Sequence, residues 1–364
     1  MSSALGKETF GQDKLSLLVV EDNEYMLDIF VNSLKRIGFP RVQKARNGKE
    51  AVEYLKMTSR GSSPGVVDPV DIVISDLVMS PVGGLNLLQW IRDDKASPNR
   101  FLPFVMISAA ADRQHVEEAR DRGVNDFMGK PFAVENLYKA LQRIIDAPRQ
   151  YVVTQVYFGP DRRRLKTGPP HSGERRRPNE HHATIVHSKD RVLTHAEPSD
   201  VWLFKLPNYL RLKMGMTNTN QSFVLPVHVL TAAEDALKRE AEGFPGWAKN
   251  YLDQISKKVA SAKQLSGDRS PYFQECNLIA HELRGQGGTF GYPLITIFAK
   301  ALYEMSGPSC RQSDADIEIM KAHIDAMRAV LRDKITGDGG DVGKQLFKAL
   351  KVQVAKFAGD AVAP

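Results

Sequence analysis

Between residues 15 and about 147, short apolar runs alternate with amphipathic stretches, and this alternation limits the fold more than any other feature of the chain. The runs read as strands at 15–20, 41–45, 71–76 and 104–108, with a short strand around Phe127. The stretches between and after them carry helical signals, at about 27–34, 50–57, 85–91, 114–122 and 134–145. Five strand and helix pairs in succession predict an α/β doubly wound fold, in which a five-stranded parallel sheet carries helices on both faces.

Charged and hydroxyl side chains stand where these apolar runs end. They are Glu21 and Asp22 after the first run, Asp76 at the end of the third, Ser108 at the end of the fourth, and Lys130 after the fifth. In a parallel sheet such positions fall at the carboxyl edge, where sites in these folds lie. Clustered carboxylates need a hard divalent cation, and magnesium suits them. Together with a hydroxyl and a lysine, they predict a magnesium-assisted phosphoryl-transfer site.

This constellation resembles the receiver domain of two-component response regulators, which has a flavodoxin-like fold, and the resemblance covers about residues 14–147. It implies that Asp76 is a nucleophile that becomes an aspartyl phosphate. It also implies a Mg²⁺ site whose ligands are Glu21, Asp22, Asp76 and the backbone carbonyl of Val78.

The same resemblance assigns roles to three further residues. Ser108 would hydrogen-bond the phosphoryl group, Phe127 would change rotamer when Ser108 moves, and Lys130 would offset the phosphoryl charge. The bond from Lys130 to Pro131 would be cis, as is usual in the family. Ser80 departs from the family pattern, because a proline is common there and here follows one position later.

Residues 230–358 carry helical signals throughout and predict an all-α bundle. Helix starts are expected at Thr231, with Glu234 completing a capping box, at Ser270 before Pro271, and at Ser313. An interruption is expected at 244–246, where a phenylalanine is followed by proline and glycine.

One histidine in this bundle is a second candidate site. His281 stands in the sequence Ala-His-Glu-Leu-Arg-Gly-Gln-Gly-Gly-Thr-Phe-Gly at residues 280–291. On a helical wheel one apolar stripe forms, which places His281 on the opposite, solvent side; the stripe is Phe273, Cys276, Ala280, Leu283 and Phe290. Gly285 and Gly288 would leave the imidazole open to a docking partner.

The segment around His281 resembles the motif of histidine phosphotransfer domains. The resemblance implies that His281 carries a phosphoryl group, whose charge Arg284 could neutralise. The phosphoacceptor helix of sensor kinases also reads His-Glu-Leu-Arg, but those proteins need an ATP-binding domain after it. The 73 residues after Gly291 contain no convincing nucleotide-binding glycine box. An ordinary surface histidine is the other alternative.

Residues 148–229 separate the two helical patterns. Up to about residue 200 they are rich in arginine, proline and glycine, which predicts a mostly disordered linker, whereas residues 201–229 are apolar enough to pack. Residues 161–191 hold nine Lys/Arg against four Asp/Glu, including Arg162 to Arg164 and Arg175 to Arg177. Guanidinium groups suit phosphates, so this tract is either a solvated tether or a site for a phosphate-bearing ligand, such as a nucleotide second messenger or a nucleic acid.

Charge, cysteine content and hydropathy bear mainly on where in the cell such a protein is expected. The net charge is +7, and Cys276 and Cys310, the only two cysteines, suggest neither a disulfide framework nor a zinc site. No apolar stretch approaches the roughly 18 residues of a membrane span. A cytoplasmic protein with reduced thiols and no membrane partner is expected.

The sequence thus predicts a phosphorelay protein with a receiver domain at residues 14–147, a linker at 148–229 and a histidine phosphotransfer-like domain at 230–358. Asp76 would accept phosphoryl from a sensor histidine kinase or phosphotransfer protein upstream, and His281 would exchange it with Asp76 or with another receiver downstream. Such a chain is a phosphoryl acceptor and donor with at most slow self-dephosphorylation, and it is not a kinase. The alternative is a receiver-switched adaptor whose arginine-rich linker binds a partner.

Overall fold

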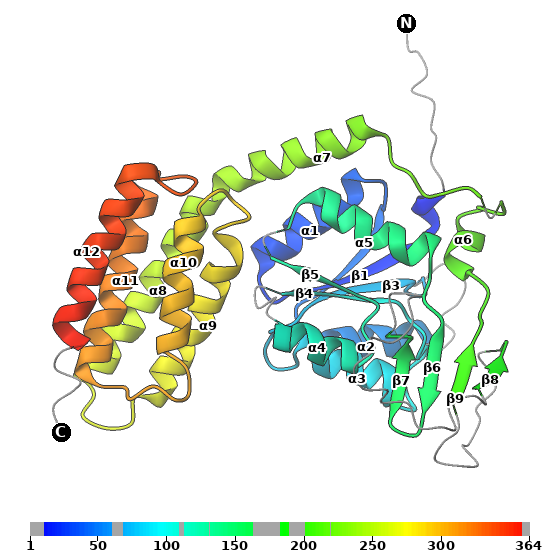
Figure 1. Ribbon diagram of the computed structural model, residues 1–364, viewed down its shortest axis with the longest axis horizontal. Coiled ribbons are helices and arrows are strands. Elements are labelled where there is room, and N and C mark those ends of the chain that lie inside the picture. The colour runs from blue at the N-terminus through cyan, green and yellow to red at the C-terminus, as the bar shows by residue number, and fades with distance from the viewer. Residues whose placement is uncertain are drawn as a thin grey trace, which may run out of the picture. The chain divides into compact units, whose positions relative to one another are not determined.

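The chain is described by a computed structural model that covers residues 11–59, 68–108, 113–130, 132–162, 183–188, 201–218 and 220–358. It forms two compact units, shown with their elements in Figure 1. The first comprises Met1–Met128 and Val134–Glu234, and the second comprises Gly129–Ala133 and Asp235–Pro364. No helix among the described residues combines the length and the apolar character needed to span a bilayer.

A five-stranded parallel sheet forms the centre of the first unit, as the sequence predicts. Its strands are β1 (Ser16–Val20), β2 (Arg41–Ala45), β3 (Ile72–Asp76), β4 (Phe104–Ser108) and β5 (Asp126–Gly129), in the order β2-β1-β3-β4-β5. Every residue of β1, β3 and β4 is buried, because helices cover both faces of the sheet. Such central strands read as continuous apolar runs, which is how they show in the sequence.

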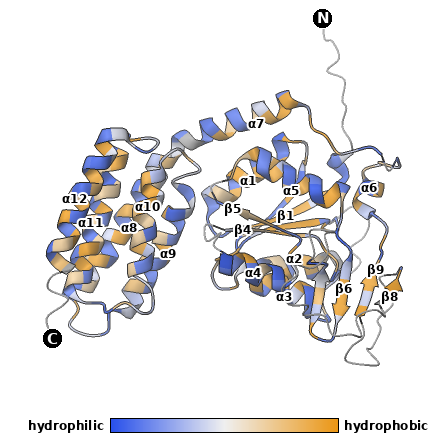
Figure 2. Cartoon of the chain, viewed as in Figure 1, coloured by the Kyte–Doolittle hydropathy of each residue, from blue (hydrophilic) through white to orange (hydrophobic). Residues whose placement is uncertain are grey.

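Five helices cover this sheet. They are α1 (Glu24–Arg36), α2 (Gly48–Ser59), α3 (Gly84–Asp93), α4 (Arg113–Asp121) and α5 (Val134–Asp146). Helices α1 and α5 lie on one face, and α2, α3 and α4 lie on the other (Figure 1). The strands are mostly apolar, whereas each helix has polar and apolar sides (Figure 2).

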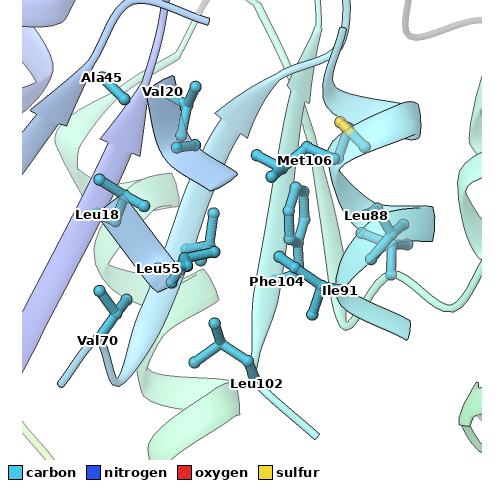
Figure 3. Packing of buried hydrophobic residues seen from close by; sticks show 14 of the residues in the cluster. Leu18, Val20, Ala45, Leu55, Val70, Leu88, Ile91, Leu102, Phe104 and Met106 are labelled. Atoms are coloured by element: carbon cyan, nitrogen blue, oxygen red, sulfur yellow. The ribbon is translucent and has the colours of Figure 1, made fainter. Parts of the chain in front are cut away.

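The core between the sheet and helices α2 and α3 is tightly packed (Figure 3). Leu18 and Phe104 from the strands meet Leu55 of α2 and Leu88 of α3, and all four side chains are at most 1% exposed. Burial of each such side chain contributes about 1.5–3 kcal/mol. This core holds the strand ends, and hence the candidate site, in a fixed register.

A second, four-stranded sheet takes three of its strands from described parts of 148–200, the segment for which a mostly disordered linker is expected; residues 163–182 and 189–200 lie outside the described residues. Its strands are β6 (Tyr151–Thr154), β7 (Tyr157–Pro160), β8 (Ala183–Val186) and β9 (Val201–Phe204), in the order β7-β6-β9-β8. The ring of Phe101, in the loop before β4, lies 5.1 Å from each of three rings of this sheet, those of Tyr151, Phe158 and Phe204. The few apolar residues of this segment therefore fold by burial against the parallel-sheet domain rather than on their own.

The segment after β9 also packs on that domain. It contains the short helix α6 (Tyr209–Lys213) and then Phe223, which is fully buried. The Phe223 carbonyl accepts hydrogen bonds from the Tyr138 hydroxyl (2.9 Å) and the Gln142 amide (2.7 Å), both on α5. Residues 201–229 thus cover α5, which gives a structure to a segment that the sequence pattern leaves unassigned.

The second unit is helical, as predicted. Its elements are α7 (Val227–Glu240), within which the boundary between the units falls, the 3₁₀ turn η2 (Ala241–Gly243), α8 (Phe244–Gln264), α9 (Ser270–Gln286), α10 (Pro293–Met305), α11 (Asp314–Arg332) and α12 (Gly340–Ala358). Helices α8 to α11 each contact two of the others, so they close into a four-helix bundle, and α12 packs on α11.

The observed helix bounds can be compared with the starts and the interruption that the sequence predicts for this unit. Ser313 caps α11 through a complete capping box with Asp316, which confirms the predicted start. The capping box at Thr231 is wrong, because α7 begins at Val227, and the Thr231 hydroxyl donates to the Val227 carbonyl at 3.0 Å inside the helix. The predicted interruption at residue 244 falls three residues earlier, at η2.

Candidate functional site

Three carboxylates meet at the carboxyl edge of the parallel sheet. Glu21 follows β1 directly, Asp22 comes next, and Asp76 is the last residue of β3. The strands β1 and β3 are paired with Val20 opposite Ser75, so their ends lie side by side. Ligand oxygens of the three residues lie within 4.8 Å of one another, with Glu21 and Asp76 buried and Asp22 exposed.

The backbone around Asp76 fixes its carboxylate. The Leu77 amide donates to Asp76 Oδ1 at 2.7 Å, and the Ser75 hydroxyl donates to the Asp76 carbonyl at 2.8 Å. Helix α3 begins close by at Gly84, where a Cβ would stand 2.1 Å from the Asp76 carbonyl oxygen. Only glycine allows this approach, so Gly84 is part of the framework of the site.

Ser80, which stands where the receiver family commonly has a proline, lies in the loop between β3 and α3. The Ser80 amide donates to Asp22 Oδ2 at 3.4 Å, and the peptide bond from Ser80 to Pro81 is cis. Val78, in the same loop, is partly buried against the core cluster. The loop therefore contacts the carboxylate cluster although its sequence differs from the usual family pattern.

The remaining predicted residues follow the neighbouring strands. Ser108 ends β4 and is fully buried, and Ile107 beside it pairs with Asp76. Phe127 lies on β5, partly buried against the core cluster, and Lys130 follows β5 directly with 8% exposure. Pro131 lies outside the described residues, so the expected cis bond at Lys130 does too.

Helix α9 of the second unit carries the apolar stripe predicted beside His281. The stripe is confirmed, because all five of its residues are buried in the bundle. The His281 ring lies 5.6 Å from the ring of Tyr303 on α10. A helical wheel shows which side of α9 is apolar, but it does not show that the neighbouring helix also reaches His281.

Tyr303 is the residue at this site that the sequence did not reveal. The Arg284 guanidinium lies over the Tyr303 ring, 5.4 Å from the ring centroid. The Asn277 side-chain amide, one turn before His281, donates to the Tyr303 carbonyl at 2.7 Å and to the Ser306 hydroxyl at 3.1 Å. Helices α9 and α10 are therefore tied together at the level of His281, with one aromatic ring touching both predicted phosphotransfer residues.

The glycines after His281 let the end of α9 pack closely against the start of α10. A Cβ at Gly287 would stand 2.8 Å from the Thr296 amide nitrogen and from the Tyr292 carbonyl oxygen. The Gly288 amide donates to the Thr296 hydroxyl at 2.8 Å, and Gly285 is buried. The glycine-rich end of α9 is thus explained in part by the close approach of the start of α10.

Arg162 is the one arginine of the tract at 161–191 that lies among the described residues. Arg162 pairs with Asp121 at 2.9 Å and lies over the Tyr157 ring at 4.0 Å. The other six arginines, at 163, 164, 175–177 and 191, lie outside the described residues.

Comparisons with known proteins bear on the first unit. The model of the response regulator receiver domain matches residues 17–142. Chemotaxis protein CheY-3 of Vibrio cholerae is 33% identical over 132 residues, which are 36% of this chain and 92% of that protein. CheY1 of Helicobacter pylori is 32% identical over 133 residues, which are 36% of this chain and 97% of that protein.

Two solved structures are similar to the same part of the chain. Vibrio cholerae CheY4 is 25% identical with a TM-score of 0.30, covering 36% of this chain and 98% of that one. The receiver domain of the sensor histidine kinase PA1611 from Pseudomonas aeruginosa, which holds a magnesium ion in its active-site cleft, is 25% identical with a TM-score of 0.30, covering 35% and 95%.

The chain therefore belongs to the response regulator receiver family, through the domain that carries Asp76. The match to the receiver domain makes this chain a two-component signalling protein. The family match ends at residue 142 and does not extend to the unit that carries His281.

Proposed function

We propose that this chain is a phosphorelay protein in which Asp76 accepts a phosphoryl group and His281 exchanges one with Asp76 or with another receiver. The observation that carries the proposal is the meeting of Glu21, Asp22 and Asp76 within 4.8 Å in a member of the receiver family. The histidine half rests on His281 and Arg284, which stand one turn apart on a helix of a four-helix bundle.

The carboxylate cluster fits a magnesium ion. Three carboxylates so close repel one another, and hard oxygen donors around a partly exposed position are the ligands that Mg²⁺ prefers. Glu21, Asp22 and Asp76, with the carbonyl of Val78, would hold the ion. When bound, it would neutralise charge on the phosphoryl oxygens.

The transfer to Asp76 is a displacement at phosphorus. A carboxylate oxygen of Asp76 attacks the phosphorus of a phosphohistidine, a P–O bond forms as the P–N bond breaks, and the departing imidazole nitrogen keeps the electron pair. Lys130 and Ser108 stand at the ends of β5 and β4, on the same edge of the sheet as Asp76, and would bind the transferred group. The Leu77 amide keeps the carboxylate oriented before the donor arrives.

The exchange at His281 runs by the same displacement with the imidazole as nucleophile. A ring nitrogen of His281 attacks the phosphorus of an aspartyl phosphate, and the carboxylate leaves with the electron pair. Arg284 lies over the Tyr303 ring that His281 also contacts, and this shared contact supports the role of its guanidinium in neutralising the phosphoryl group. The upstream donor would be a sensor histidine kinase or phosphotransfer protein, and the downstream acceptor a second receiver.

Transfer of radiolabelled phosphoryl tests both halves. The intact chain, Asp76→Asn and His281→Gln are each incubated with a panel of phosphorylated sensor kinases and then with separate receivers, and His228→Gln serves as the control for loss of an exposed histidine. We expect Asp76→Asn to lose the alkali-labile acyl phosphate and His281→Gln to lose the acid-labile, alkali-stable label. Full labelling of Asp76→Asn would exclude the first half, and intact onward transfer by His281→Gln would exclude the second.

The adaptor alternative gains no support from the described residues. Arg162, the one described arginine of the tract, is held by Asp121 and Tyr157. In the experiment above, an adaptor would show a label on Asp76 alone.

A further inference from the structure

A cavity of about 510 Å³ opens in the first unit, at the amino edge of the parallel sheet. Asp71 and Pro103, which line it, stand directly before β3 and β4, whereas Asp76 ends β3 at the carboxyl edge. The cavity is therefore separate from the carboxylate cluster. Its size lies within the range of about 300–1,000 Å³ that is typical of small-molecule sites.

Half of the cavity wall comes from chain segments beyond the receiver domain. Residues 148–151, 204 and 206–210 line it, and the domain contributes the loop before β4 and the end of α5. The family match ends at residue 142, so the matched domain alone lacks this cavity. The site exists because the second sheet and α6 fold back onto the domain.

The wall is held rigid by a buried arginine. Arg92 of α3, 1% exposed, donates to the carbonyls of Gly123 (3.1 Å) and Leu102 (2.9 Å) and to Asn125 Oδ1 (2.9 Å). The same Asn125 oxygen accepts from the Tyr151 hydroxyl at 3.3 Å. A wall fixed in this way costs little to order when a ligand binds, which favours binding.

The acids of the lining are already paired. Asp126 accepts two hydrogen bonds from Arg143, at 2.8 and 2.5 Å, and Asp71 accepts from Lys213 at 2.6 Å and from the Ser16 amide at 2.7 Å. A positively charged ligand would have to displace one of these cations. The cavity therefore disfavours cations.

The remaining lining is largely apolar and aromatic. Four aromatic residues line it, and one of them, Tyr209, is 51% exposed; the four are Phe101, Tyr151, Phe204 and Tyr209. Aromatic walls bind flat ring systems through offset-stacked and edge-to-face contacts, each worth about 0.5–1.5 kcal/mol beyond the buried area. The polar groups of the wall are already bonded within the protein: the Asn208 side chain donates to the Ile145 carbonyl at 2.6 Å and accepts from the Arg211 amide at 3.2 Å, and Asp126 pairs with Arg143.

We propose that this cavity is a binding site for a planar aromatic small molecule that carries no positive charge. The site lies outside the phosphoryl-transfer machinery and gives the chain an input other than phosphorylation. It does not depend on the proposed relay.

Prodan, a neutral naphthalene fluorophore, is a suitable probe for titration against the full chain. We expect saturable binding at one site with a blue-shifted emission. Ala147→Trp places a large ring on the exposed lining position at the end of α5 and should weaken binding by at least about tenfold. Ala232→Trp, on the exposed side of α7, is the matched control and should bind as the parent does.

Three outcomes decide the proposal. Unchanged prodan binding in Ala147→Trp, or no binding to the parent chain, overturns it. Equal binding of a trimethylammonium analogue of prodan overturns the charge selectivity. Photo-crosslinking with a diazirine-bearing naphthalene needs no variant, so it remains decisive if Ala147→Trp does not fold; a label on peptides 143–151 or 204–210 supports the site, and a label found only elsewhere overturns it.

Discussion

The ring of Tyr303 on α10 lies 5.6 Å from the ring of His281 on α9, and the guanidinium of Arg284 lies over the same Tyr303 ring. One aromatic side chain thus contacts both residues proposed to handle a phosphoryl group in the second unit. Because Asn277 ties the Tyr303 backbone to α9 at 2.7 Å, the ring is held in place from the same helix that it contacts.

Removal of this ring should slow phosphoryl transfer through His281. A cation over an aromatic face is worth about 0.5–1 kcal/mol at an exposed site, so Tyr303→Ala should reduce the transfer rate by roughly two- to five-fold. Tyr303→Phe keeps the ring and should stay near the parent rate. Single-turnover transfer from the labelled chain to a separate receiver gives both rates, and equal losses in the two variants would show that the ring is not what matters.

Gly84→Ala should destabilise the first unit by about 2 kcal/mol or more, as overpacking against a rigid neighbour does. The new Cβ would stand 2.1 Å from the Asp76 carbonyl, so either β3 or the start of α3 must shift. Gly246→Ala on α8 is the control, because a Cβ there meets nothing within 4 Å. Urea unfolding followed by circular dichroism measures both, and a Gly84→Ala midpoint equal to the parent's would contradict the close approach.

Magnesium binding should depend on the carboxylate cluster. Asp22→Asn removes one charged oxygen ligand from the cluster while leaving the buried Glu21 and Asp76 in place, and we expect Mg²⁺ affinity to fall at least about tenfold. Asp68→Asn is the matched control, since Asp68 is exposed and pairs with Arg41 at 2.7 Å. Isothermal titration with MgCl₂ measures the affinities; equal losses in the two variants would indicate a general charge effect instead of a site.

The receiver fold is readable from the sequence because its signals are local. Strands β1, β3 and β4 are buried on both faces, so each is a continuous apolar run, and the residues that end them must meet at one edge of a parallel sheet. That is why Glu21, Asp22 and Asp76 could be placed together without any structure. The short strand β2, three of whose five residues are exposed, was also predicted with the same bounds.

The second sheet was missed because its signals are not local. Each of its strands has four residues, and its rings pack on Phe101, about 50 residues before Tyr151 in the chain. The average composition of 148–200, rich in arginine and proline, hides this small apolar set. The environment of His281 was missed for a similar reason, because Tyr303 belongs to the next helix and a helical wheel describes one helix alone.

The stability of the second unit should fall as the solution is acidified through the ordinary pKa of histidine. Burial lowers the pKa of His323 on α11, and the hydrogen bond from its Nδ1 to the Ile319 carbonyl (2.9 Å) only partly opposes this effect. The unfolded chain therefore takes up a proton at higher pH than the folded chain does. Below a pH of about 6.5 the unfolded state binds more protons, so the free energy of unfolding decreases until the folded-state pKa is passed.

His323→Gln should flatten this pH dependence, because the neutral amide does not titrate. His228→Gln removes an exposed imidazole and should leave the dependence as in the parent. Hydrogen exchange of α11 amides between pH 5 and 8, corrected for intrinsic exchange rates, reports the local unfolding free energy of this helix. The same slope in His323→Gln and in the parent would mean that the buried histidine is not the group that makes the bundle sensitive to acid.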